Sequence, residues 1–193
     1  MRISVKRAIA LPVAALSAVA LTGLAAGTAS ADATSGSVTL NINASFVKAL
    51  ASHGVALHPQ GASSISYANG VISVTFAVTG GDADLTTFSG TLSTSGDICA
   101  LDVKTHKHVE ITSLLFDLLD AQWDGSTPTS GGAEPFVDLA GSQAGNINGT
   151  TETYSSTDLT IDPVGAADLN AALGTSAFVS GTDIGSFSAT WVV

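Results

Sequence analysis

The sequence predicts an all-β domain, mainly an antiparallel sandwich or a barrel-like sheet, with two short helices. The first observation behind this prediction is that short alternating segments, separated by turn residues, recur along most of the chain. The second is a hairpin signature at Asn69-Gly70, and the third is that only two segments show helical periodicity between cap residues. Residues 32–193 are long enough for one domain with a sizeable core and too short for two.

Residues 1–31 have the organisation of a cleaved secretory signal peptide. A short basic segment precedes an apolar run, which closes on Ala29-Ser30-Ala31. Small side chains at these positions fit the pocket of signal peptidase, whereas a retained membrane anchor needs no such site. We therefore expect a secreted chain that begins at Asp32, is extracellular or loosely associated with the cell surface, and has no membrane span after cleavage.

The strand predictions rest on alternation and turn chemistry. Ser64–Ala68 and Val71–Val78 flank Asn69-Gly70, a dipeptide that supplies the positive φ angles of a two-residue hairpin turn. The Gly- and Ser-rich segment Asp124–Ala133 is predicted to be a surface loop. The other strands are predicted at Val38–Ile42, Phe88–Ser93, Ile98–Val103, Val109–Thr112, Leu114–Trp123, Phe136–Leu139, Thr151–Ile161 and Ile184–Val192.

Two segments, 44–53 and 163–173, are predicted to be helical. Asn43 and Asp162 precede them as candidate N-terminal caps, and a glycine follows each of them. One face of each helix is apolar and should pack on the sheet. These faces consist of Phe46, Val47, Leu50 and Ala51 in the first helix, and of Ala166, Leu169, Ala172 and Leu173 in the second.

The chain expected after cleavage is strongly acidic. It retains three lysines against 16 acidic residues, which gives a net charge of −13. Nucleic acid and anionic membrane surfaces are therefore disfavoured as partners, and a small molecule or a cell-surface component is favoured without being identified. Cys99, the single cysteine, lies between apolar residues, so we predict a packed side chain and not a nucleophile.

Two segments contain candidate metal ligands. His106 and His108 are two residues apart, so on a strand both imidazoles would project from one face and could share a metal ion, with Asp102 or Glu110 as a third ligand. The alternative for this pair is a solvent-exposed hairpin tip. Gly81–Asp84 places two carboxylates in a Gly-rich loop, which is the weaker signature of a calcium site.

Catalytic motifs give no candidate residue. The Gly-x-Ser-x-Gly signature of serine hydrolases does not occur in the sequence. A glycosidase needs two carboxylates at a fixed separation, and nothing distinguishes Glu110, Glu134 or Glu152 for that role. A non-catalytic protein is therefore the favoured interpretation.

Several stretches, spread over most of residues 37–190, carry a resemblance to a known family. They are Ser45-Phe46 at the start of a short helix, Phe88–Leu92, Ser95–Asp97 and Leu101–Val103 in a central hairpin, Val109–Ile111 in the next strand, and Leu159-Thr160 with Gly165-Ala166 and Leu169 in a closing strand and helix. In the order and spacing of these stretches, the chain resembles the HtaA-type secreted or surface domains of actinobacteria. The resemblance implies a β-rich fold and a role related to haem binding.

Two departures from the family pattern concern the haem site. As the resemblance implies, haem-binding members have an iron-ligating tyrosine three residues after the phenylalanine and a supporting histidine after the hairpin glycine. These positions are Ala49 and Asp97 in this sequence. A methyl group and a carboxylate cannot replace a tyrosinate and its partner, so we expect the inherited site to be absent. Candidates for substitute haem ligands are Tyr67, Tyr154, His53 and His58.

Three hypotheses for function follow. The first is a secreted, non-catalytic binding or interaction domain of the HtaA type that lacks the tyrosine–histidine haem site. The second is a haem or metal carrier that uses ligands other than the inherited ones. The third is a small secreted hydrolase. Haem is the cofactor that the resemblance implies, and no cofactor follows from the residues alone.

Overall fold

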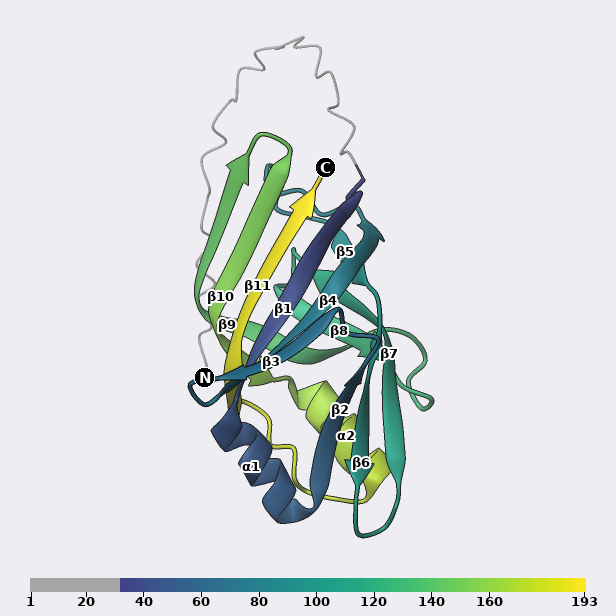
Figure 1. Cartoon of the computed structure of the whole chain (residues 1–193). Helices are drawn as coiled ribbons and strands as arrows, with labels where there is room; N and C mark the ends of the chain where they lie inside the picture. Colours follow the sequence, from purple (N-terminus) through teal and green to yellow (C-terminus); the bar gives the residue numbers. More distant parts are fainter. Residues whose placement is uncertain (1–31) are drawn as a thin grey trace, which may run out of the picture.

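The computed structural model describes residues 32–193, and the expected signal peptide lies outside them. Figure 1 shows both helices at one end of a twisted sheet, and a long β hairpin projecting at the other end. The helices are α1 (Ala44–His53) and α2 (Pro163–Leu173). The strands are β1 (Ser35–Asn43), β2 (Val55–Gln60), β3 (Ser64–Ala68), β4 (Val71–Gly81), β5 (Thr91–Thr94), β6 (Asp97–Asp102), β7 (His108–Asp117), β8 (Gln122–Ser126), β9 (Glu134–Asn148), β10 (Thr151–Ile161) and β11 (Asp183–Val192).

The sheet is closed. Within residues 32–193, eight antiparallel strands form a barrel in the order β7-β5-β4-β1-β11-β10-β9-β8, and β8 pairs back onto β7 with Phe116 opposite Trp123. Outside the barrel, β6 pairs with the first half of β7, β2 pairs with β6, and β3 pairs with β4. The predicted all-β, mainly antiparallel class is thus confirmed, and its form is a barrel.

The helices have the predicted bounds. The side chain of Asp162 accepts a hydrogen bond from the Val164 N–H at 2.6 Å, and Pro163 occupies the first helical position of α2. Gly54 and Gly174 end the two helices in the left-handed conformation, with φ angles of 85° and 70°. The buried residues of α1 are Phe46 and Leu50, and those of α2 include Ala166, Leu169 and Leu173. Ala51, which was predicted to lie on the packed face of α1, is instead exposed.

One predicted cap is wrong. The side chain of Asn43 makes no hydrogen bond to the first turn of α1. Asn43 is the last residue of β1, and its amide instead donates to the Asp183 carboxylate of β11 at 3.3 Å. The pairing of β1 with β11 therefore directs the Asn43 side chain toward Asp183, whereas the local sequence predicted that it would cap α1.

The region around residues 114–126 differs from the prediction in two ways. Leu114–Trp123 is not one strand, because the Asp117 carboxylate accepts hydrogen bonds from the Leu119 and Asp120 N–H groups and forms a turn between β7 and β8. The predicted loop begins only at Thr127, since β8 continues to Ser126. Gly125 permits this close packing: a Cβ atom there would lie 2.5 Å from Ile111 Cγ2.

Other strands also differ from the prediction, and β9 continues to Asn148, well beyond the predicted Phe136–Leu139. β2 was not predicted, and it contains Pro59, which an edge strand tolerates because one side of its backbone needs no partner. β5 begins at Thr91 and not at Phe88, whose φ angle of 52° belongs to a turn.

The barrel interior is filled with aromatic side chains. Phe116 lies 4.8 Å from Phe187 and 5.4 Å from Tyr154 between ring centroids, and all three rings are buried. Trp191 is fully buried, and its indole N–H donates to the Ala83 carbonyl at 3.1 Å.

Among the described residues, no helix is long and apolar enough to cross a membrane.

Candidate functional site

The two positions that correspond to the family haem site lie on α1 and β6. Ala49 is exposed on α1, beside the buried face that Phe46 and Leu50 form. Asp97 is the first residue of β6 and is paired with Gln60 of β2. Neither side chain can act as a tyrosinate ligand or its imidazole partner.

The candidate substitute ligands lie on separate elements. His53 is the last residue of α1, His58 lies on β2, and Tyr67 lies on β3 with 70% of its surface exposed. Tyr154 is instead a core residue: its hydroxyl donates to Gln143 Oε1 at 2.5 Å, and burial raises the pKa of its phenol. A haem-ligand role for His53, His58 or Tyr67 stays a prediction.

The His106–His108 segment is a hairpin tip. His106 has a φ angle of 58° and lies in the turn, whereas His108 begins β7, so the two do not share one strand. The Asp102 carboxylate, a candidate third ligand, accepts hydrogen bonds from the Thr105 and Lys104 N–H groups, which lower its pKa. Among residues 32–193 no group of three or more potential ligands is close enough to hold a metal ion, and a metal role for the pair stays a prediction.

Cys99 lies in a row of polar side chains across three strands. His58 of β2 pairs with Cys99 of β6, which pairs with Glu110 of β7. The pKa of the thiol is raised, first by desolvation and then by the negative charge of Glu110. The thiol is therefore protonated at neutral pH, which makes it a weak nucleophile and a weak metal ligand.

The loop between β4 and β5 uses its carboxylates for its own backbone. Asp82 accepts a hydrogen bond from the Thr91 N–H, and Asp84 accepts one from the Thr86 N–H, which lowers the pKa of Asp84. Buried Glu152 accepts a hydrogen bond from the Leu85 N–H of the same loop. These bonds give the carboxylates a structural role without a calcium ion.

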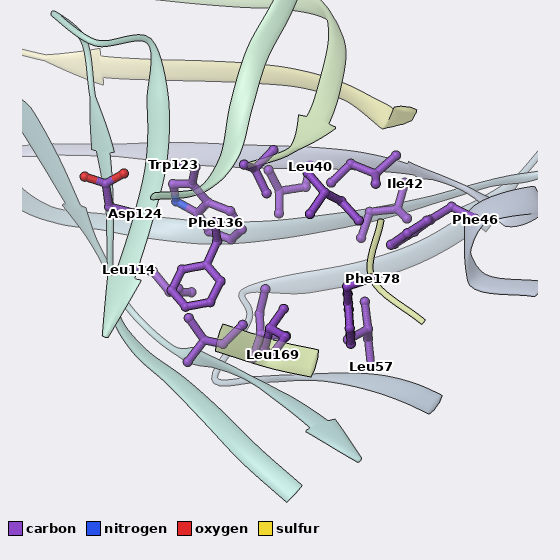
Figure 2. A pocket seen from close by; sticks show the side chains of 15 residues that line it. Leu40, Ile42, Phe46, Leu57, Leu114, Trp123, Asp124, Phe136, Leu169 and Phe178 are labelled. Carbon is purple, nitrogen blue, oxygen red and sulfur yellow. The ribbon is translucent and has the colours of Figure 1, made fainter. Parts of the chain in front are cut away.

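A feature that sequence reasoning missed is an apolar cavity at the helical end of the barrel, seen in Figure 2. Its volume is about 70 Å³. Barrel strands supply residues such as Leu40 and Leu114, α1 supplies Phe46, α2 supplies Leu169, and the segment after α2 supplies Phe178. The alternating pattern of the sequence predicts that many of these apolar side chains point inward. It cannot show that they leave a cavity between them.

Trp123 and Asp124 border this cavity and carry two buried polar atoms without partners among the described residues. Trp123 is 3% exposed, and its Nε1 makes no hydrogen bond. The Oδ1 atom of Asp124 is likewise unpaired, and in Figure 2 its carboxylate points away from the other labelled side chains. Desolvation, followed by the charges of Asp117, Asp120, Asp162 and Asp138, raises the pKa of Asp124 to about 6.

Both the empty space and the unpaired donor are unfavourable for stability. A cavity of 70 Å³ costs about 2 kcal/mol at the usual rate per unit volume. An unpaired buried N–H costs a further ~1–3 kcal/mol.

Comparisons with known proteins bear on the fold. No family profile matches the chain, and no curated protein matches it. Among solved structures, the C-terminal domain of HtaA from Corynebacterium glutamicum superposes with a TM-score of 0.60 at 14% identity, over 83% of this chain and 98% of that one. A domain-swapped dimer of a histidine-to-alanine variant of the same domain superposes with a TM-score of 0.52 at 15% identity, over 78% and 92% of the two chains.

The chain has an HtaA-type fold. This agreement confirms the resemblance that the order of the sequence stretches predicted. At such low identity the superposition shows the HtaA-type architecture alone, so side chains must be compared position by position. Ala49 and Asp97 stand at the two positions that the resemblance assigns to the haem site, and Phe46 of α1 is among the residues that line the cavity.

Proposed function

We propose that this protein is an exported, non-catalytic binding module of the HtaA type that has lost the tyrosine–histidine haem site. The observation that carries the proposal is the exposed methyl group of Ala49 on α1, where the resemblance calls for a tyrosine ligand. The HtaA-type fold supports a haem-related binding role, and the exchange at position 49 removes the iron ligand.

The state of the polar groups supports a non-catalytic role. The Cys99 thiol is held in its protonated form, and the carboxylates of Asp82, Asp84 and Asp102 accept hydrogen bonds from their own turns. A general base or a nucleophile must be free to accept a proton or attack a substrate. These groups instead hold the loops in place.

Titration of residues 32–193 with ferric haem tests the proposal. We expect no one-to-one endpoint and no ligand-to-iron charge-transfer band, because Ala49 and Asp97 offer no ligand. Weak association without the band would agree with the proposal, since an apolar porphyrin face binds many surfaces. A sharp endpoint with the band would overturn it, and Tyr67→Phe, His53→Ala and His58→Ala would then identify the substitute ligand.

The double variant Ala49→Tyr with Asp97→His is the converse test. If the positions are matched correctly, this variant gains the charge-transfer band. The control pairs Asp97→His with Ala51→Tyr, which places the tyrosine at another exposed position of the same helix. A band in the control but not in the double variant would show that the positions are matched wrongly.

A further inference from the structure

The outer strand of the projecting hairpin, β9, has a free edge at the end of the molecule opposite the helices (Figure 1). We propose that residues 143–148, named here the β9 edge, pair antiparallel with the same residues of a second copy of this chain. The two sheets then join across a two-fold axis at Gly145. The inference goes beyond the proposed function, because it depends neither on the haem site nor on the cavity.

One side of the β9 edge has no partner strand. β8 pairs with β9 only from Glu134 to Asp138, whereas β10 continues along β9 to Asn148. Within residues 32–193, no strand pairs with the side of the β9 edge that faces away from β10. Every residue of the β9 edge is exposed, and Figure 1 shows β9 on the outer side of the hairpin. A strand in this position can pair with a further strand.

The unpaired backbone groups alternate along the β9 edge. The two-residue turn after Asn148 makes Asn148 and Thr151 a pair that exchanges backbone hydrogen bonds. Bonded and non-bonded pairs alternate in an antiparallel ladder, so the N–H and C=O groups of Ile147, Gly145 and Gln143 point away from β10. Each of these residues therefore presents one donor and one acceptor to a second strand.

The β9 edge lacks the features that usually prevent pairing between strand edges. Such edges are protected by a lysine, a proline, an inward-pointing charge or a very short strand. Two other outer strands follow this rule, since β2 contains Pro59 and β3 has only five residues. By contrast, residues 140–151 contain no proline and no charged residue. Of these three strands, β9 alone offers an edge that is open to pairing.

Charge and side-chain size favour a second copy as the partner. The chain from residue 32 is strongly acidic, so two copies repel each other at most contacts. Pairing of two β9 edges places no charged side chains opposite each other. A foreign peptide that adds a strand is selected through pockets for its side chains. Ala144, Gly145 and Asn146 are too small to wall such a pocket, but they allow two identical strands to approach closely.

The two-fold axis defines the register of the pair. With Gly145 opposite Gly145 of the second copy, Gln143 lies opposite Ile147 of the second copy, and every outward N–H group finds an acceptor. Ile147 is 46% exposed, and the Gln143 side chain of the second copy would cover part of its surface. Because only one strand of each copy contributes, the contact is smaller than a standard interface, and the dimer should be weak and reversible.

Sedimentation equilibrium of residues 32–193 is the first test. Between about 10 µM and about 1 mM protein, we expect a reversible equilibrium between monomer and dimer. Raising the NaCl concentration from about 0.15 M to about 0.5 M should strengthen the dimer, because salt screens the repulsion between two acidic copies. A monomer at every protein concentration and at both salt concentrations would overturn the inference.

Nuclear magnetic resonance identifies the residues in contact. The amides of Gln143, Gly145 and Ile147 should exchange about two- to fivefold more slowly at the highest protein concentration than at the lowest, because pairing protects their N–H groups. In a mixture of isotope-labelled and unlabelled chains, a nuclear Overhauser contact should join Ala144 Hα to Asn146 Hα of the second copy, which are close in this register. A dimer without this protection and this contact, such as one formed by exchange of elements between copies, would overturn the inference.

Ile147→Pro is the deciding variant, because it removes an outward N–H group and no hydrogen bond to β10. It should weaken dimerisation by at least about tenfold. Ile147→Thr is the matched control, since it keeps the N–H group and a β-branched side chain, and it should weaken dimerisation less than about threefold. Equal loss in the two variants would assign the association to the exposed side chain and overturn strand pairing. If Ile147→Pro does not fold, the amide exchange of the unaltered chain decides.

Discussion

At the scale of single residues, Asp124 shows how the fold changes the chemistry of a side chain. The sequence around it is rich in Gly and Ser and predicted an exposed loop. In the structure, β8 continues through Asp124, and carboxylates from the β7–β8 turn, β9 and the start of α2 gather around it. No local pattern contains this information, because Asp138 and Asp162 reach Asp124 only through the closed barrel.

The raised pKa of Asp124 predicts a pH dependence of stability. Its folded-state pKa of about 6 lies above the ordinary value of 3.8, so the folded state binds more protons between these values and the free energy of unfolding falls as the pH rises from about 4 to 6. Asp124→Asn should remove this dependence and stabilise the protein at pH 7.5 by on the order of 1 kcal/mol after allowance for solvent screening. Urea unfolding at a series of pH values measures it.

The control for this experiment is Asp32→Asn, at an exposed position that makes no contribution to the raised pKa of Asp124. It should leave the pH profile parallel to that of the parent protein. If Asp124→Asn gives the same parallel profile, the Asp124 carboxyl is not the group that titrates near pH 6.

At the scale of elements, the helices were predictable because their signals are local. Asp162, Pro163 and the glycine after each helix act within one turn, and the predicted bounds match the structure. The cap at Asn43 failed because its amide bonds across to β11, which local sequence cannot reveal. The same limit applies to the cavity, whose wall combines residues from almost every element.

The caps of the two helices provide a matched pair of variants. Asp162→Ala removes the hydrogen bond from the Val164 N–H and should destabilise the protein by about 1 kcal/mol. Asn43→Ala should change the free energy of unfolding by only about 0.3 kcal/mol, because the Asn43 side chain does not cap α1. Chemical denaturation measures both. Asp162→Asn keeps a side chain that can accept this hydrogen bond but removes the charge, so it should retain most of the stability. If Asp162→Asn and Asp162→Ala destabilise the protein equally, the charge of Asp162 and not its hydrogen bond stabilises the helix.

At the scale of the whole molecule, alternation predicted the class but not the closure. A sandwich and a barrel have the same inward and outward pattern, and only the pairing of β7 with β8 and of β1 with β11 distinguishes them. The inner aromatic layer of Phe116, Tyr154 and Phe187 joins strands that are distant in sequence. This layer is the core on which the barrel depends.

Substitution in this layer should have a large effect. Phe116→Ala leaves a cavity between two rings and should destabilise the protein by ~3–5 kcal/mol. Phe88→Ala is the control, because Phe88 also contacts Tyr154 but is 43% exposed, and it should lose less than about 1 kcal/mol. Thermal unfolding monitored by circular dichroism measures both, and similar losses would mean that Phe116 is not central to the core.

The pairing of β1 with β11 places the two ends of the described chain side by side. Thr34 donates its backbone N–H to the Val192 carbonyl at 2.8 Å, although 158 positions separate these residues in sequence. A short glycine linker could therefore join residues 34 and 193, and new ends could be opened between the exposed Gly131 and Gly132.

Such a circular permutant turns the longest-range strand pair into a local hairpin. Its mean contact order falls, so it should fold at least as fast as the parent chain while its free energy of unfolding stays within about 1 kcal/mol. Stopped-flow refolding measures the rate. A permutant opened between Ser186 and Phe187, inside β11, should not fold, because the cut divides a central strand of the barrel.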